Sequence, residues 1–593
     1  MTEPRPTDGR LARLRSIRLD LLVALALAAV LSTGWAIADW AQVGRLLLPD
    51  NDDMIRLAQV RDWLAGQGIN DWTQYRMAPP LGAPMHWSRI NDFGIAAIVL
   101  GLTPLLGRHH AELAAVLAYP ALLFACALLL SARIGRRLWG PPAGPVAAIL
   151  TALAFPGTTV FVPGRIDHHA LQVVLIQALV LALMRAPAAA AGAAAGAAAA
   201  LSLIVGLETA PQVVALVLVP CLLWTARGRE ERARLAGFAA ALGGTTLLFL
   251  MLLRPNYWPA ALCDAFTPAS STGMLAASAA LALLAAATPL LGRWELRLGM
   301  GALLGGCALG GVLRAFPSCI GGPYGQVDPF LQRNFLAHIE EANGIFTLDD
   351  PFRAISIAGL LAAGCAASLW LGLREPRRWP VLLPLAAAIL ASALVTLAQV
   401  RGAYIGAPLA APMLAGVVLA ARARSSWRLP AVMGAWLACA GLTYLEAPRA
   451  VARMLAPRAA PPAPQTPQSI CGSGNAWAQL DRLPPGVTMA PTSIASYLIG
   501  ATHHSTVGAG YHRNNAGNMA MYRFFLSAPD RAREIGREWK VDYVAICPGD
   551  FGEIRVSSDF PDSLAARLKR GEVPPWLEPF PLRDTRLRLF KVR

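Results

Sequence analysis

The sequence has few charged residues for its length. Asp, Glu, Lys and Arg make up 15% of the 593 residues, whereas 55% are hydrophobic. Leu- and Ala-rich runs repeatedly reach membrane-spanning length, which excludes a water-soluble core over the first 446 or so residues. The formal net charge of +16 comes mostly from Arg in short loops between apolar runs. Positive charge in such loops fixes membrane orientation, so we do not expect binding to nucleic acid.

Cysteine is also scarce, and its spacing is not that of a metal site. Most of the nine cysteines lie in or beside apolar runs, where a free thiol behaves as a small hydrophobic group. These are Cys126, Cys221, Cys263, Cys307, Cys365 and Cys439. Only Cys471 and Cys547 share a polar domain, where an oxidising compartment would permit a disulfide. Free thiols at these two positions remain the alternative.

The N-terminal region lacks the features of a removable signal peptide. Five Arg residues between positions 5 and 18 precede an apolar run from Leu19 to Ile37, which is too long and has no cleavage-type end. We therefore expect this run to be the first membrane span, with the N-terminus in the cytoplasm.

One orientation satisfies the positive-inside tendency along the whole chain. The run from Phe93 to Leu106 is short and is expected to be an interfacial helix, because counting it as a span would place the basic cluster at 133–137 outside. About thirteen spans are then predicted. They lie near 19–37, 111–132, 143–161, 170–184, 188–206, 211–225, 235–253, 273–292, 298–315, 354–373, 380–399, 403–421 and 429–445.

The predicted domains follow from this topology. Residues 1–446 form the membrane domain, in which the Ala/Gly tract from Ala188 to Ala200 suits close helix packing rather than a linker. Residues 447–467 are a Pro/Ala-rich linker, and residues 468–593 alternate strand-like runs (GVTMAP, VDYVAIC, LRLFKV) with helical ones. We expect a small α/β domain on the non-cytoplasmic side.

Polar residues gather in the segments that this topology places outside. Asp50, Asp52 and Asp53 follow the first span. Charge so near hydrocarbon is costly unless it binds a cation or a polar substrate. The alternative is that these residues form a solvated helix cap. Asp167 and His169, in GRIDHH after the third span, can ligate one divalent ion if the backbone is extended there. A polar boundary turn is the plainer interpretation.

Three further charged residues stand near the outer membrane edge. Glu341 lies in HIEE within the large outer loop, where an exposed helical face would also explain it. Arg401, in RGAYIGAP, violates the positive-inside tendency and suits a lipid-linked phosphate, although snorkelling to headgroups is equally compatible. Glu208, in GLETAP, has no evident partner.

In the order of these features the chain resembles the GT-C class of membrane glycosyltransferases, and specifically the single-subunit oligosaccharyltransferases of bacteria and archaea. The segment NDDMIRLAQVRDWLAG is similar to that family's first outer loop, which implies that Asp52 is the metal-binding catalytic Asp. GRIDHHAL is similar to its second acidic motif and implies that Asp167 and His169 are metal ligands. HIEE matches its fifth-loop motif only in the Ile and final Glu, which implies that Glu341 is a catalytic residue on the acceptor side. RGAYIGAP is similar to the segment with its donor-phosphate Arg, here Arg401.

The chain departs from that family in its C-terminal domain. The WWDYG motif, which recognises the hydroxyl residue of an N-glycosylation sequon, is replaced by SYLIGATHHSTVGAGYHRNN. This segment offers a different set of acceptor-side candidates: His503, His504, Tyr511, His512, Arg513 and Asn514. The acceptor is therefore expected to be another glycan, a lipid or a protein hydroxyl.

The resemblance implies a multi-pass glycosyltransferase of the bacterial inner membrane, with its C-terminal domain in the periplasm. It would move sugar from a polyprenyl-phosphate or polyprenyl-diphosphate donor, with Mg²⁺ or Mn²⁺ held by Asp52, Asp167 and His169. Asp52 is also a candidate general base, and Asp50 or Asp53 could take that role instead. The alternatives are a transporter or flippase of lipid-linked sugars and an inactive scaffold that recruits partners.

Overall fold

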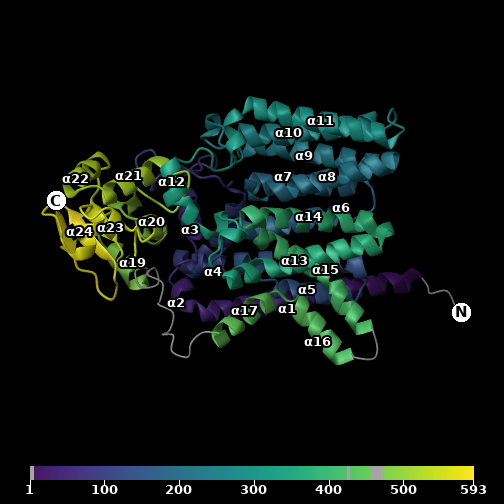
Figure 1. Cartoon of the computed structure of the whole chain (residues 1–593), viewed down its shortest axis with the longest axis horizontal. Helices are drawn as coiled ribbons and strands as arrows, with labels where there is room; N and C mark the ends of the chain where they lie inside the picture. Colours follow the sequence, from purple (N-terminus) through teal and green to yellow (C-terminus); the bar gives the residue numbers. More distant parts are fainter. Residues whose placement is uncertain (1–5, 424–427, 456–470, 472) are drawn as a thin grey trace.

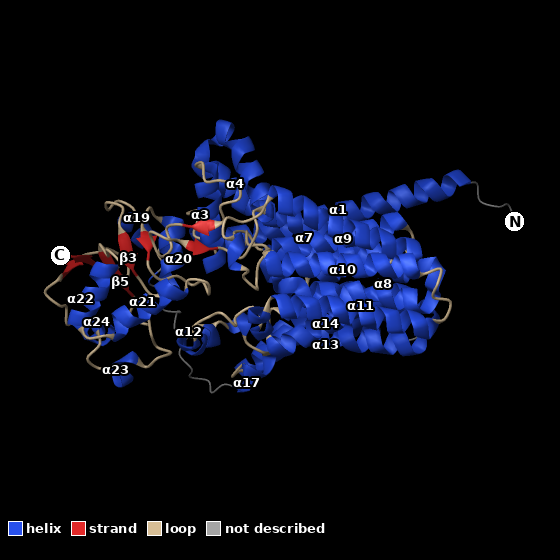
Figure 2. Cartoon of the chain, turned by 90° about the horizontal axis from the view of Figure 1, so that it is seen from above, coloured by secondary structure: helices blue, strands red, loops and turns tan. Residues whose placement is uncertain are grey.

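Long apolar helices dominate the computed structural model, which describes residues 6–423, 428–455, 471 and 473–593. They lie side by side in one bundle, and a domain with a small sheet sits at one end of it (Figure 1, Figure 2). Within the described residues, eight helices are long and apolar enough to cross a membrane, or nine if a bent pair forms one span. The polytopic helical fold is confirmed, whereas the count of thirteen spans is not.

The bundle helices begin and end close to the predicted spans. They are α1 (Pro6–Ala38), α4 (Ile90–Trp139), α5 (Ala143–Ala152), α6 (His169–Leu183), α7 (Ala189–Val205), α8 (Ala210–Arg227), α9 (Arg232–Leu252), α10 (Pro268–Ala287), α11 (Trp294–Ala315), α13 (Pro351–Arg374), α14 (Trp379–Ala398) and α15 (Gly402–Ala423). Three of them, α5, α6 and α7, have fewer residues than a full span. The helix observed within the predicted span at 143–161 is shorter than expected. Helix α5 ends at Ala152, and a 3₁₀ turn follows at Gly157–Phe161.

Helix α4 breaks at Gly107, whose φ of 74° is not helical. The break separates residues 90–106 from residues 108–139, in agreement with a separate short helix before the second predicted span. Glycine suits this position because a side chain disfavours positive φ.

The span predicted near 429–445 is bent rather than one continuous helix. The segment forms α16 (Arg428–Cys439) and α17 (Gly441–Leu455), which meet at 90°. The turn brings Gly441 against the backbone of α5's C-terminal end, where a Cβ at Gly441 would lie 2.5 Å from the Phe155 nitrogen. Helix α17 also includes residues 447–455 of the predicted linker, whereas residues 456–467 lie outside the described residues.

The Ala/Gly tract forms α7 and packs closely against α9, as expected for a small-residue interface. A Cβ built on Gly192 would lie 2.0 Å from the Arg234 carbonyl oxygen, and one on Gly196 would lie 2.3 Å from that of Phe238. The helices can approach this closely only because these positions lack side chains.

We expect Gly192→Ala to lower the free energy of unfolding by about 1–3 kcal/mol, because the added methyl group overpacks the α7–α9 interface. Thermal or denaturant unfolding of the detergent-solubilised protein measures this. Gly244→Ala in α9 is the matched control, because nothing lies within 4 Å of a Cβ there and alanine favours a helix by about 1 kcal/mol. Equal stability of the two variants would contradict the interpretation of α7 as a closely packed helix.

The C-terminal domain contains a five-stranded mixed sheet in the order β4-β3-β5-β7-β6. Its strands are β3 (Val487–Met489), β4 (Ser505–Thr506), β5 (Tyr543–Ile546), β6 (Leu577–Phe580) and β7 (Arg588–Val592). Its helices are α19 (Gly474–Leu480), α20 (Thr492–Ala501), α21 (Asn515–Leu526), α22 (Pro529–Glu538), α23 (Val556–Asp559) and α24 (Leu564–Arg570). The three predicted strands are confirmed. Strand β4 is too short to predict, and β6 contains Pro579, which fits only an edge strand.

The first outer loop docks onto this domain. It contains α2 (Trp40–Val43), α3 (Asn51–Leu64), β1 (Thr73–Gln74) and β2 (Ala83–Pro84). Its backbone pairs with β4, since Thr506 N–H donates to the Arg76 oxygen and Ala78 N–H to the Thr506 oxygen, each at 2.8 Å. Arg61 of α3 donates to the Gly500 oxygen at 2.6 Å. The domain is thereby fixed over the end of the bundle where the predicted outer segments meet.

Two disulfides lie in these outer segments. Cys471 pairs with Cys547, and Cys263 pairs with Cys319. The expectation that Cys263 is a free thiol beside an apolar run is therefore wrong, because residues 253–267 lie between α9 and α10 and are not part of either helix. The remaining outer helix in this region is α12 (Pro329–Asn334).

Candidate active site

A cavity of about 1040 Å³ lies where the bundle meets the outer segments. Charged and polar side chains from widely separated parts of the chain line it. They include Asp50, Asp52, His86, His169, Glu208, Asp264, Tyr324, Glu341, Arg401, Tyr511 and His512. The cavity therefore collects two of the C-terminal candidates and six of the residues singled out near the predicted membrane edge, namely Asp50, Asp52, His169, Glu208, Glu341 and Arg401.

Arg165 ties the two acidic segments to each other. Its guanidinium lies 2.6 Å from Asp50, 3.4 Å from Asp53 and 2.8 Å from Asp167. Asp50 also caps α3 by accepting the Asp52 N–H, and the fully buried Asp53 accepts the N–H groups of Ile166 and Asp167. These contacts hold the start of α3 against the GRIDHH loop.

Asp52 stands apart from this network. Within the part of the chain that the structure describes, its carboxylate makes no hydrogen bond or ion pair, and it is half-buried in the cavity wall. Burial raises the pKa of Asp52 well above its usual range, and the neighbouring carboxylates Asp50, Glu341 and Asp167 raise it further. A cation bound here would relieve this repulsion.

His169 presents an unused ligand atom. Its Nδ1 lies 3.1 Å from Asp167 Oδ2, and its backbone N–H donates to Asp167 Oδ1. Its Nε2 is buried without a hydrogen-bond partner among the described residues. Burial alone would raise the pKa of Asp167, but Arg165 and His169 outweigh it and hold that pKa well below its usual range. Burial alone would lower the pKa of His169, but Asp167 outweighs it and raises that pKa to about 9, so a metal bound at Nε2 would take the place of a proton.

Carboxylate oxygen and imidazole nitrogen are both ligands for divalent ions, but among the described residues Asp52, Asp167 and His169 do not form a group whose ligand atoms all lie within 4.8 Å of one another. Asp52 and His169 line the cavity, whereas Asp167 is 1% exposed and lies against His169. Two other groups of three described residues do have their ligand atoms within 4.8 Å of one another. One is His86, His168 and Glu208, and the other is His86, Asp264 and His512.

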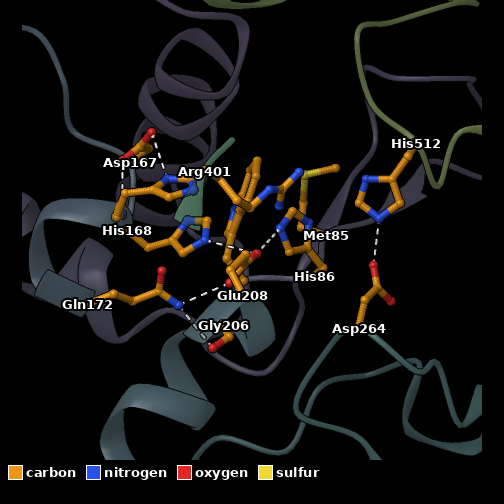
Figure 3. A network of polar contacts seen from close by, with 12 residues as sticks. Met85, His86, Asp167, His168, Gln172, Gly206, Glu208, Asp264, Arg401 and His512 are labelled. Atoms are coloured by element: carbon orange, nitrogen blue, oxygen red, sulfur yellow. Dashed lines mark hydrogen bonds and ion pairs between the residues drawn. The ribbon is translucent and has the colours of Figure 1, made fainter. Parts of the chain in front are cut away.

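Hydrogen bonds and one close ion-pair contact connect the first of these groups (Figure 3). Glu208 lies 2.9 Å from His86 Nε2 and 3.1 Å from His168 Nε2, and it accepts the Gln172 amide at 3.0 Å. Arg56 donates to His168 Nδ1 at 3.2 Å. Because Arg has only donors, His168 Nδ1 must accept and its Nε2 must carry the proton given to Glu208. His168 is therefore unsuited to bind a metal through Nε2. Glu208, for which the sequence suggested no partner, contacts His86, His168 and Gln172.

Burial keeps the two imidazoles around Glu208 neutral. It lowers the pKa of His86 to about 3 and also lowers the pKa of His168. Burial thus disfavours a positive charge on both rings beside Glu208.

The second group joins the C-terminal domain to the loop before α10. Asp264 lies 2.5 Å from His512 Nε2 and forms a bidentate contact with Arg513 (Figure 3 shows the His512 contact). Burial alone would raise the pKa of Asp264, but Arg513 and His512 outweigh it and hold that pKa far below its usual range. Tyr511 accepts the His86 backbone N–H at 2.7 Å, which seats this segment against the first outer loop.

Arg401 faces the cavity beside Tyr324 and Glu341. Its Nη2 donates to the Tyr324 hydroxyl at 2.7 Å and lies 3.8 Å from Glu341 Oε1, and its side chain is 13% exposed. Burial alone would lower the pKa of Arg401, but Glu341 and Tyr324 reverse this and raise it above its usual value. A charged guanidinium with donors to spare is thus present at the cavity wall.

The six C-terminal candidates separate into two sets. Tyr511 and His512 line the cavity, and the Arg513 side chain lies behind them on Asp264. The other three lie elsewhere: His503 is 76% exposed on Asp481, His504 is buried against the Leu480 oxygen, and Asn514 donates to the Val507 oxygen. His86 and Asp264 were not predicted, because each is a lone residue in an outer loop with no spacing that connects it to the others.

No protein-family model matches the chain, and no curated protein sequence matches it significantly. Solved structures do match along nearly the whole length. The archaeal oligosaccharyltransferase AglB from Archaeoglobus fulgidus, in complex with an inhibitory peptide and a dolichol-phosphate, has 14% identity and a TM-score of 0.64, covering 96% of this chain and 73% of its own. The Archaeoglobus fulgidus enzyme with Zn and sulfate has 15% identity and a TM-score of 0.61, covering 94% and 71%.

A third structure of the Archaeoglobus fulgidus oligosaccharyltransferase is tethered to an acceptor peptide with the NVT sequon. It has 15% identity and a TM-score of 0.63, and the match covers 97% of this chain and 74% of that one. The chain therefore has the fold of these oligosaccharyltransferases, and the expected GT-C-like architecture is confirmed.

Proposed function

We propose that the chain is a membrane glycosyltransferase. It would move a sugar or oligosaccharide from a polyprenyl-phosphate or polyprenyl-diphosphate to an acceptor on the non-cytoplasmic face of a bacterial inner membrane. One observation carries the proposal: a single cavity collects Asp52, His169, Glu341 and Arg401 from distant segments of a fold shared with oligosaccharyltransferases.

A divalent cation, Mg²⁺ or Mn²⁺, would be held by Asp52, Asp167 and His169. When bound, it would supply Lewis-acid stabilisation of the charge that develops on the leaving phosphate. The uncompensated carboxylate of Asp52 and the unpaired Nε2 of His169 support this assignment. Asp167 orients the His169 ring through Nδ1, and Arg165 keeps Asp167 ionised.

Arg401 would bind the donor phosphate. A guanidinium can donate two parallel hydrogen bonds to phosphate oxygens, and Tyr324 and Glu341 hold this one in place without consuming all its donors. One of the structurally similar oligosaccharyltransferases is complexed with dolichol-phosphate, a ligand of the same chemical kind. Direct attack by the acceptor on the anomeric carbon would invert its configuration.

The acceptor would enter between the C-terminal domain and the bundle, where Tyr511 and His512 line the cavity and Glu341 stands near Asp52. A similar structure holds an acceptor peptide. The WWDYG motif of the family that the sequence resembles is absent from this chain, so we propose a glycan, lipid or protein hydroxyl as acceptor in place of a sequon Asn.

The test combines purified protein, radiolabelled polyprenyl-linked sugars and membrane extract. Label should pass from the lipid to an extract component. Flux of intact lipid-linked sugar across proteoliposomes, with no transferred label, would instead identify a flippase and contradict the proposal.

In the same assay, Arg401→Gln is expected to raise the donor KM by about 100-fold, because losing one partner of a buried charge contact costs about 2–5 kcal/mol. Arg401→Lys should recover part of this loss, since lysine keeps the charge but not the bidentate geometry. Arg531→Gln is the control, because its side chain is 57% exposed, pairs with Glu534 on α22 and does not line the cavity. A donor KM that is unchanged in Arg401→Gln would remove this residue from the donor site.

A further inference from the structure

We infer that His512, oriented by Asp264, is the general base that accepts the proton of a hydroxyl-bearing acceptor. This inference rests on the proposed glycosyl transfer and deepens it, because it assigns both a catalytic group and the chemical class of the acceptor.

The contacts of His512 leave one ring nitrogen available. Its Nε2 lies 2.5 Å from Asp264 Oδ2, and Arg513 Nε lies 3.1 and 3.0 Å from the two oxygens of the same carboxylate. Asp264 is therefore an acceptor-only anion, so His512 Nε2 carries the proton and Nδ1 carries a lone pair. Within the described residues Nδ1 has no hydrogen-bond partner, and the imidazole lines the cavity with its side chain 14% exposed.

Asp264 is held firmly enough to orient the ring. The preceding residue, Cys263, is disulfide-bonded to Cys319, and the Arg513 guanidinium also lies 5.7 Å from the centre of the Tyr257 ring. An imidazole that hydrogen-bonds a fixed carboxylate through one nitrogen and presents the other to a cavity is the arrangement by which histidine serves as a base.

His512 also lies close to the residue proposed for the donor phosphate. Its ring centre is 5.3 Å from that of Tyr324, and the Tyr324 hydroxyl accepts a hydrogen bond from Arg401. On its other side, the His86 ring centre is 5.1 Å away. A hydroxyl that reaches Nδ1 therefore enters the cavity next to the donor phosphate subsite.

The carboxylates of the cavity are less suited to this role. Asp50 pairs with Arg165 and caps α3, and Asp53 accepts two backbone N–H groups. Glu208 hydrogen-bonds His86 and Gln172 and lies 3.1 Å from His168 Nε2. Asp52 is assigned to the cation. His512 combines three properties of a base: it lines the cavity, a carboxylate holds its Nε2, and its Nδ1 has no hydrogen-bond partner within the described residues.

The step is a direct displacement. The acceptor oxygen forms a bond to the anomeric carbon while its O–H bond breaks and the proton moves to His512 Nδ1. The bond between the anomeric carbon and the phosphate oxygen breaks, and its electron pair leaves with the polyprenyl phosphate or diphosphate. His512 becomes an imidazolium that Asp264 stabilises until the proton returns to water.

The experiment uses the purified full-length protein, a radiolabelled polyprenyl-linked sugar, and methanol or 2,2,2-trifluoroethanol as simple hydroxyl acceptors. His512→Gln should lower kcat with methanol by about 100-fold or more, the usual contribution of a general base. The loss should be smaller with trifluoroethanol, which is the more acidic alcohol and needs the base less. The donor KM should stay unchanged, and added imidazole should restore part of the rate.

His503→Gln is the matched control, because this neighbouring histidine is 76% exposed and pairs with Asp481 outside the cavity. It should behave as wild type. Asp264→Asn, which retains a neutral hydrogen-bond partner for His512, should give a smaller loss than His512→Gln with the same dependence on the alcohol.

Three outcomes would overturn the inference. First, His512→Gln could transfer sugar at the wild-type rate. Second, its activity with both alcohols could fall by the same factor while the donor KM rises. Third, its lower activity could follow entirely from a lower unfolding temperature. The last two would mean that Asp264, His512 and Arg513 only dock the domain. If wild-type protein leaves the donor uncleaved with membrane extract and with both alcohols, the proposed transferase function itself fails.

Discussion

Asp52→Asn is expected to reduce sugar transfer by on the order of 1000-fold. The change removes the charged ligand that faces the cavity, and Lewis-acid stabilisation by a bound metal contributes several kcal/mol, with each 1.4 kcal/mol equal to a factor of ten. Treating the wild type with EDTA should cause a loss of similar size that added Mg²⁺ or Mn²⁺ reverses. Initial rates with a radiolabelled polyprenyl-linked donor measure both effects.

Asp62→Asn is the control for this change. Asp62 lies on the same helix, α3, but its carboxylate accepts a hydrogen bond from Gln74 and does not line the cavity. We expect it to retain activity and its response to EDTA. Transfer that survives both EDTA and Asp52→Asn would exclude a metal-dependent mechanism at this site.

Asp92→Ala is expected to lower the free energy of unfolding by about 3–5 kcal/mol, the usual result of removing one member of a buried ion pair. Asp92 lies 2.7 Å from Arg56 and 3.2 Å from Arg89, and all three side chains are at most 1% exposed. Its removal leaves two guanidinium groups buried without a counter-charge. Activity should fall as well, because Arg56 fixes the proton position on His168.

Denaturant unfolding in detergent micelles measures the stability change. Glu375→Ala provides the comparison, since the Glu375–Arg378 pair lies at the surface and such pairs contribute about 0–1 kcal/mol. Asp92→Asn should be less harmful than Asp92→Ala because an amide can still accept hydrogen bonds. A loss in Asp92→Ala no larger than in Glu375→Ala would mean that the two arginines find other partners or reach water.

Helix positions were largely predictable from the sequence because hydrocarbon imposes a strong length and composition requirement. The predicted spans at 211–225 and 403–421 coincide with α8 and α15 to within a few residues. The failures occur where tertiary contacts override hydropathy. Gly441 turns the chain by 90° against the end of α5, and residues 153–161 leave the helix although they are apolar.

The candidate site was predictable only where charged residues stand at the edge of an apolar run in the sequence. Asp52, His169, Glu341 and Arg401 could be singled out because charge at a membrane edge is rare, and the structure places all four on one cavity. His86 and Asp264 carry no such signal. Their roles depend on contacts with residues 122 and 248 positions away in the chain, namely Glu208 and His512.

The backbone pairing between the first outer loop and the C-terminal domain implies an order of events during biosynthesis. Arg76 hydrogen-bonds the Thr502 oxygen across 426 residues. At the usual elongation rate of 5–20 residues per second, a ribosome needs about 20 to 90 s to add that length of chain. The loop that carries Asp52 and His86 therefore has no partner for its pairing edge until the C-terminal domain has been synthesised. A chaperone that covers residues 76–78 during this interval would protect the nascent protein from mispairing.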